Sequence, residues 1–116
     1  MLTLEGLKAL GVNTEEGLTR CMNNESFYLR LCGRGIEDAN FERLETSLKA
    51  GSIRESFEAA HALKGVLGNL AITPVLKPVT ELTEKLRNAD AMPEYEACLR
   101  EINEQRAKIV ALAKEG

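Results

Sequence analysis

Apolar residues recur at intervals of three and four along nearly the whole of this chain, which is the spacing of one face of an α-helix. No segment alternates apolar and polar residues with period two, and no Asn-Gly or Asp-Gly pair offers a tight hairpin turn. The pattern predicts an all-α protein. Because the connections between helices are short, we expect an up-and-down antiparallel four-helix bundle preceded by one or two short helices.

The first part of the chain, residues 1–35, is predicted to form the short helices. A leucine stripe at positions 4, 7 and 10 should end in a left-handed cap at Gly11. Asn13 and Asn24 can each cap a further helix, because a short polar side chain accepts a hydrogen bond from a free N–H of the first turn. The second of these helices should fray near Gly33 and Gly35.

Residues 38–114 are predicted to form the core of the bundle, within a single domain of residues 1–116. Pro78 lies inside the third bundle helix, where it should kink or delay that helix. The expected boundaries are Gly51 at the end of the first helix, Ser52 and Glu55 as the capping box of the second, Thr73 and Pro74 as the cap and first residue of the third, and Pro93 at the start of the fourth.

Composition excludes several classes of function. The chain has a net charge of −3, no basic tract and few aromatic residues, so we expect no nucleic-acid partner. The N-terminus lacks a charged region followed by a long apolar run, so we expect a cytoplasmic protein with no signal peptide and no membrane span. We also expect the protein to be a monomer. Three widely spaced cysteines (Cys21, Cys32 and Cys98) favour a reducing compartment over a disulfide framework or a zinc site.

The segment AAHALKGVLGNLAI, residues 59–72, contains the single histidine, His61. At about 100° per residue, His61 falls roughly 85° from the centre of the predicted inner face, on the shoulder of its helix. Lys64 lies beside it, and Gly65 and Gly68 flank it. The residues predicted for the inner face are Ile53, Phe57, Ala60, Leu67 and Ala71.

The two glycines indicate that this surface must be approached closely. A glycine inside a helix costs about 1 kcal/mol relative to alanine, so either a neighbouring helix or an outside partner should need the space. An exposed imidazole is mostly neutral near pH 7 and keeps one nitrogen lone pair available as a nucleophile. Lys64 could stabilise a dianionic group on that nitrogen. The patch is therefore suited to carrying a phosphoryl group, and the chain has no phosphate-binding glycine-rich loop that would generate one.

The run A-H-A-L-K-G-x-x-x-N-L, from Ala60 to Leu70, resembles the signature of histidine-containing phosphotransfer (HPt) domains. The resemblance extends less specifically to the KAG turn at 49–51 and to the ELTEKLR helix at 81–87. It implies that His61 accepts a phosphoryl group from a receiver-domain aspartate and passes it to another receiver. It also implies that Lys64 lies beside the phosphate and that Gly65 admits the partner.

The same resemblance implies a phosphocarrier of a two-component phosphorelay, without an ATP site, a metal or a cofactor of its own. The receiver would bring Mg²⁺ and the acidic pocket. Partners would be response-regulator receiver domains, which a hybrid histidine kinase can also carry. We expect the receiver to contact Arg54, Glu58, Ala62, the outer edge of Leu63, Gly65 and Gly68 around the histidine.

Some positions depart from the family pattern, among them Pro78, Gly33 and Gly35, which are described above. Ala71 replaces a glycine that often follows the Asn-Leu pair, a change that helix propensity would favour. The family's next helix commonly offers the histidine a glutamine. Here the candidates for that partner are Thr83 and Arg87.

Plainer interpretations remain open. His61 could be a structural histidine at a helix boundary, Lys64 a solvated lysine, and either glycine a point of close helix packing. The acidic residues of the last two helices, such as Glu84, are expected on solvated faces. A helical docking or scaffold module without phosphotransfer is the alternative function. Haem or metal binding through His61 is disfavoured, since the chain has no second histidine.

Overall fold

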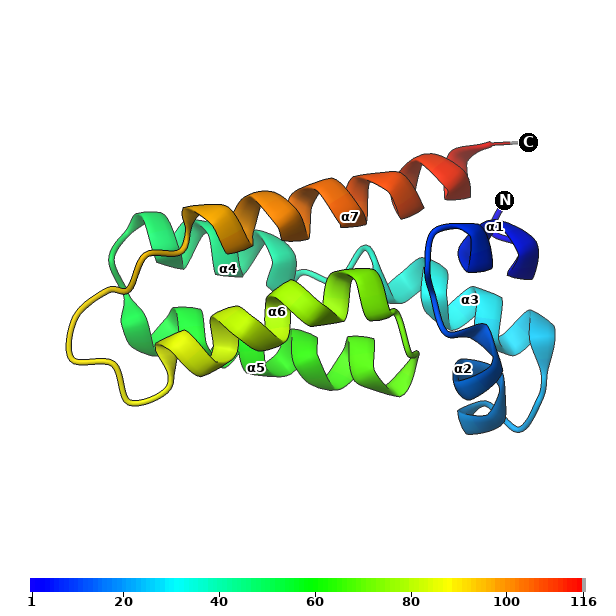
Figure 1. Cartoon of the computed structure of the whole chain (residues 1–116), viewed down its shortest axis with the longest axis horizontal. Helices are drawn as coiled ribbons and strands as arrows, with labels where there is room; N and C mark the ends of the chain where they lie inside the picture. The colour runs from blue at the N-terminus through cyan, green and yellow to red at the C-terminus, as the bar shows by residue number, and fades with distance from the viewer. Residues whose placement is uncertain (116) are drawn as a thin grey trace.

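The computed structural model describes residues 1–115 and is helical throughout its regular structure (Figure 1). The prediction of an all-α fold is confirmed. The helices are α1 (Leu4–Ala9), α2 (Thr14–Arg20), α3 (Glu25–Gly35), α4 (Asn40–Lys49), α5 (Ile53–Asn69), α6 (Thr73–Leu86) and α7 (Glu96–Lys114). Three helices therefore precede the bundle, where one or two were expected.

The four helices α4 to α7 alternate in direction and form the up-and-down bundle (Figure 1). Helix α4 packs on α5, α5 on α6, and α6 on α7. Their inward side chains form one continuous core with apolar residues of the N-terminal helices. None of the helices in residues 1–115 is long and apolar enough to cross a bilayer.

Helix boundaries that depend on local chemistry lie where the sequence places them. The side chains of Asn13 and Asn24 accept hydrogen bonds from backbone N–H groups in the first turns of α2 and α3. Ser52 accepts from the N–H of Glu55 at the start of α5, as predicted. Gly51 adopts a left-handed conformation, with φ of 79°, directly after α4.

Other boundaries were wrong by one to three residues. Helix α6 begins at Thr73 itself, with Ile72 as its N-cap, because the Thr73 hydroxyl donates to the Ala71 carbonyl at 3.2 Å and does not cap the helix. Helix α7 begins at Glu96, so Pro93 lies in the preceding loop. Helix α3, by contrast, ends at Gly35, the second of the two glycines near which it was expected to fray.

Pro78 does not delay α6, which begins five residues earlier and continues past it. Its ring is buried in the bundle. Proline at this position cannot donate the backbone hydrogen bond to the carbonyl four residues earlier.

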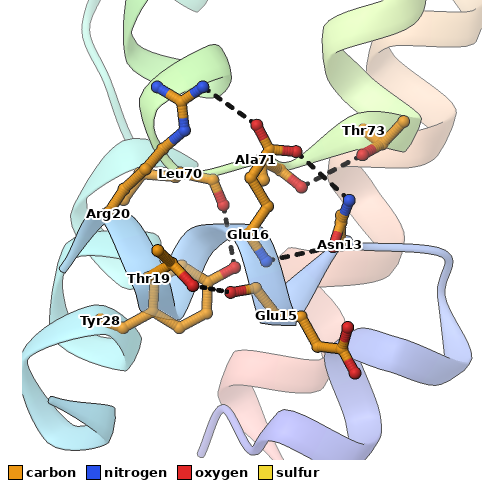
Figure 2. Close-up of polar contacts among 9 residues, drawn as sticks. All are labelled: Asn13, Glu15, Glu16, Thr19, Arg20, Tyr28, Leu70, Ala71 and Thr73. Atoms are coloured by element: carbon orange, nitrogen blue, oxygen red, sulfur yellow. Dashed lines mark hydrogen bonds and ion pairs between the residues drawn. The ribbon is translucent and has the colours of Figure 1, made fainter. Parts of the chain in front are cut away.

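The N-terminal helices cover the end of the bundle where α5 passes into α6 (Figure 1). The N–H of Asn13 donates to the Ala71 carbonyl at 3.1 Å. The buried Tyr28 hydroxyl donates to the Leu70 carbonyl at 2.9 Å (Figure 2). A Cβ at Gly17 would overlap the Tyr28 ring, so α2 can lie this close to α3 only because residue 17 is glycine. These contacts fix α2 and α3 against the C-terminal end of α5.

Ala71 follows the end of α5 and has a φ of 54°, in the left-handed region. The expectation that helix propensity favours alanine at this position is therefore wrong. An L-residue with a Cβ is strained in this conformation by about 1–2 kcal/mol, whereas glycine adopts it freely. Nothing in the structure explains why alanine occupies the position.

Candidate functional site

The buried face of α5 differs from the predicted one. When Phe57 is placed at 0° around the helix axis, the centre of the buried face lies roughly 100° from Phe57 and about 55° from the predicted centre. His61 lies about 140° from the centre of the buried face. Phe57 is only partly buried, while Leu63 is fully buried and has no outer edge to offer a partner. Small residues contribute much of this face, because α4 and α6 both pack on it. The buried residues of α5 are Ser56, Ala59, Ala60, Leu63 and Leu67.

The opposite side of α5 carries most of the predicted site residues in one strip. Arg54, Glu58, His61, Gly65 and Gly68 follow one another at intervals of four, three, four and three, so they share one face of the helix over about 21 Å. The first four are exposed, and Gly68 is partly exposed, as is Ala62 beside the strip. We refer to these five residues as the α5 strip.

Neither glycine of the α5 strip packs against another helix. A Cβ built at Gly65 or at Gly68 would meet no atom within 4 Å, in contrast to one at Gly17. Close packing therefore does not explain these two glycines. They border a shallow hollow of about 350 Å³, whose lining residues are Arg20, His61, Lys64, Gly65, Gly68 and Asn69.

The imidazole of His61 has one aromatic neighbour on its own helix. The Phe57 ring lies one turn earlier on α5, with ring centroids 5.7 Å apart and planes tilted by 32°. No hydrogen bond within residues 1–115 involves the His61 ring. Thr83, expected as a partner, is buried and donates to the Val79 carbonyl at 2.7 Å. Arg87, the other candidate, places its guanidinium 5.2 Å from the centroid of the Phe57 ring.

Lys64 projects toward α6, where its Nζ lies 3.8 Å from Oε2 of Glu84. The same carboxylate pairs with Arg87 at 3.1 Å. The Arg87 guanidinium, and to a smaller extent the Lys64 ammonium, lowers the pKa of Glu84. Glu84 is exposed, as expected, but its contact with Lys64 could not be predicted, since it depends on how α5 and α6 pack.

Glu58 lies one turn before His61 and is held by two arginines. Nη2 of Arg43, from α4, lies 2.8 Å from one of its oxygens, and Nε of Arg54 lies 3.4 Å from the other. Hydrogen bonding from Arg43, followed by that from Arg54, lowers the pKa of Glu58. The Glu58 carboxylate is therefore charged, and the two arginines compensate its negative charge next to His61.

The sequence did not indicate Arg20 or Asn69 as members of the hollow, and Arg20 is the one lining residue that lies outside α5. It belongs to α2, far from His61 in the chain, and its Nη2 lies 3.0 Å from Oε1 of Glu16. No local pattern could have found it, because the approach of α2 to α5 depends on the Asn13 and Tyr28 contacts. Within residues 1–115 no cluster of three His, Cys, Asp or Glu side chains could hold a metal ion.

These features define a helical-bundle domain with an exposed histidine on one helix face, beside a lysine and two glycines that no other helix covers. The model of the Hpt domain family matches residues 38–113, and the chain belongs to this family. The match includes α4, α5 and α6 and most of α7, and it leaves α1 to α3 outside. No curated protein and no solved structure matches the chain. Membership supports a general role in histidine phosphotransfer within a phosphorelay, with receiver domains as the partner class.

Proposed function

We propose that His61 is the residue of this Hpt domain that carries the phosphoryl group, taking it from an aspartate of one receiver domain and giving it to an aspartate of another. The observation that carries the proposal is the exposed imidazole beside an open hollow, flanked by Lys64 and by two glycines that no helix covers. A histidine with a purely structural role would be expected to hydrogen-bond across a helix boundary. No such bond is present within the described residues.

The proposed step is an in-line displacement at phosphorus. The lone pair of the unprotonated ring nitrogen forms a P–N bond, while the P–O bond to the receiver aspartate breaks and its electron pair returns to the carboxylate. The proton on the other ring nitrogen remains there or is lost to water. Return transfer to a second receiver is the reverse step, with aspartate as the nucleophile. The domain contributes a positioned nucleophile, while Mg²⁺ and the acidic pocket belong to the receiver.

Lys64 is proposed to stabilise the dianionic phosphoryl group on His61. It lies three residues after the histidine on the same helix, and its ammonium is held near the site by a single long contact to Glu84. A pair between exposed charges at 3.8 Å is weak, so the ammonium can exchange Glu84 for a phosphoryl oxygen. Glu84 would then act as the resting partner of this lysine.

The receiver is proposed to cover the α5 strip together with Ala62. Such an interface is small and transient, which suits a carrier that must release one partner before it meets the next. Gly65 and Gly68 would let the receiver backbone approach the helix closely. In this proposal the chain acts as a cytoplasmic monomer and has no ATP site of its own.

The test mixes the protein with receiver domains that have been labelled with radioactive phosphate on aspartate. Wild type should acquire label that is labile in acid and stable in base, as phosphohistidine is, and His61→Gln should acquire none. A second, unlabelled receiver added afterwards should remove the label from the wild type. Lack of label on the wild type with every available receiver would contradict the proposal and would favour the docking module without phosphotransfer.

A further inference from the structure

We infer that Arg20, on the N-terminal helix α2, is a docking residue that contacts an acidic edge of the receiver domain and helps to determine which receivers are accepted. The inference rests on the proposed function, since it concerns the same surface. It adds a residue from outside the matched family region, because residues 1–37 precede the match at 38–113.

The first argument is position. Arg20 lines the hollow together with His61, Lys64, Gly65 and Gly68, although it comes from another helix. A molecule that approaches His61 and covers the two glycines therefore meets the Arg20 side chain at the border of the same hollow. Half of that side chain is exposed.

The second argument is that Arg20 is held in place. Its guanidinium pairs with Glu16 one turn earlier, and the Glu16 carboxylate also accepts a hydrogen bond from Nδ2 of Asn13 at 3.3 Å (Figure 2). Helix α2 is itself fixed to the turn after α5, through Asn13 to Ala71 and, by way of α3, through Tyr28. Because a guanidinium has five N–H donors, the contact with one carboxylate leaves donors for a partner.

The third argument concerns which part of the receiver Arg20 would contact. Helix α2 is anchored at residues 70–71, near the C-terminal end of α5, and Gly68 lies about 10 Å from His61 along the helix axis. Gly17, one turn before Arg20, lies against Tyr28, whose hydroxyl bonds the Leu70 carbonyl, so Arg20 approaches the hollow from the C-terminal end of α5, away from the imidazole. We assign it to the partner's surface and not to the phosphorus atom.

The fourth argument is charge. Arg20 and Lys64 line the hollow, and their carboxylate partners, Glu16 and Glu84, lie outside its lining, which contains no acidic side chain. An acidic edge on the partner is the complement of such a border. Charges at the edge of an interface act mainly on the rate of encounter and on the choice of partner, and less on the chemical step. Arg20 should accordingly alter docking and leave the transfer step unchanged.

The experiment measures the rate of phosphoryl transfer from a labelled receiver as a function of receiver concentration. Arg20→Glu should raise the half-saturating receiver concentration about tenfold, Arg20→Ala by a smaller factor, and Arg20→Lys should stay near wild type. The rate at saturation should not change. Arg30→Glu, at an exposed position on α3 that does not line the hollow, is the matched control and should behave as wild type.

Labelling by phosphoramidate, a small phosphodonor that needs no docking, provides the second measurement. Arg20→Glu should react with it at the wild-type rate, while its unchanged rate at saturating receiver shows that the site is folded. A slower reaction would overturn the assignment and place Arg20 at the phosphoryl group. An unchanged receiver dependence in Arg20→Glu would overturn it while the proposed function stands. If the wild type itself accepts nothing from receivers, the proposed function fails and the inference fails with it.

Discussion

Replacing Gly68 by alanine should stabilise the protein, although it changes a residue next to the candidate site. An added Cβ would meet no atom within 4 Å, so nothing offsets the gain in helix propensity of about 1 kcal/mol. At roughly 2.1 cal/mol/K per residue, the 116 residues give an unfolding entropy of about 0.24 kcal/mol/K. Thermal unfolding followed by circular dichroism should therefore show a Tm about 4 °C higher, and about 8 °C higher when Gly65 is replaced as well.

Gly17→Ala is the matched control, because it makes the same chemical change inside another helix. There the methyl group would overlap the buried Tyr28 ring, so overpacking should destabilise the protein by about 1–3 kcal/mol. Opposite signs at positions 17 and 68 are the expected result. A lower Tm in Gly68→Ala would refute the reasoning and would mean that this glycine serves packing.

Gly68→Arg tests whether the open surface at position 68 is needed for phosphoryl transfer. The long side chain should leave the fold intact and block a receiver from the α5 strip, so transfer from a labelled receiver should fall at least tenfold. Ala107→Arg, at an exposed position on α7, introduces the same side chain elsewhere and should transfer normally. Transfer at the wild-type rate by Gly68→Arg would refute docking over the two glycines.

Three further predictions concern individual residues. Glu84→Gln should release Lys64 from its ion pair and speed phosphoryl transfer onto the histidine by roughly two- to fivefold, measured at saturating receiver; a slower rate would show that Glu84 is needed to position the lysine. Because Arg87 lowers the pKa of Glu84 below its ordinary value of 4.5, the ion pairs of this carboxylate should be fully formed above that pH and lost as the pH falls through the lowered value. A carboxyl NMR titration checks this, and a midpoint at or above 4.5 would contradict it. Ala71→Gly should relieve the left-handed backbone strain and stabilise the protein by about 1 kcal/mol. The measurement is the denaturant midpoint of unfolding, which should rise. An unchanged midpoint would mean that the flexibility of glycine in the unfolded chain cancels the relief of strain.

Local chemistry explains which parts of the fold could be predicted from the sequence. Asn13, Asn24 and Ser52 each cap a helix through a bond to a residue three positions later, so all the information lies in a short stretch of sequence. Gly51 likewise ends α4 by its own backbone conformation. Residue spacing alone predicts that the residues of the α5 strip share one face, since residues on one helix keep fixed angular relations, but it did not predict how far that face lies from the core.

Packing between helices explains what the sequence could not reveal. The buried face of α5 was misplaced because the prediction weighted large apolar residues such as Phe57, whereas small residues such as Ser56 and Ala59 lie against the neighbouring helices. The Lys64–Glu84 pair and the approach of Arg20 both join residues on different helices. Neither contact produces a periodic pattern in the sequence.

The glycines inside helices show why the candidate site could not be identified from the sequence alone. In the sequence, Gly17, Gly35, Gly65 and Gly68 all look alike, as poor helix formers within helical segments. In the structure, a Cβ at either of the first two would collide with a buried side chain, whereas one at either of the last two would meet nothing within 4 Å. Packing explains why Gly17 and Gly35 are glycines. No contact within the described residues explains Gly65 and Gly68, which lie beside His61. The proposed receiver domain, which must come close to the exposed imidazole, would account for a surface that lacks side chains at a loss of helix stability.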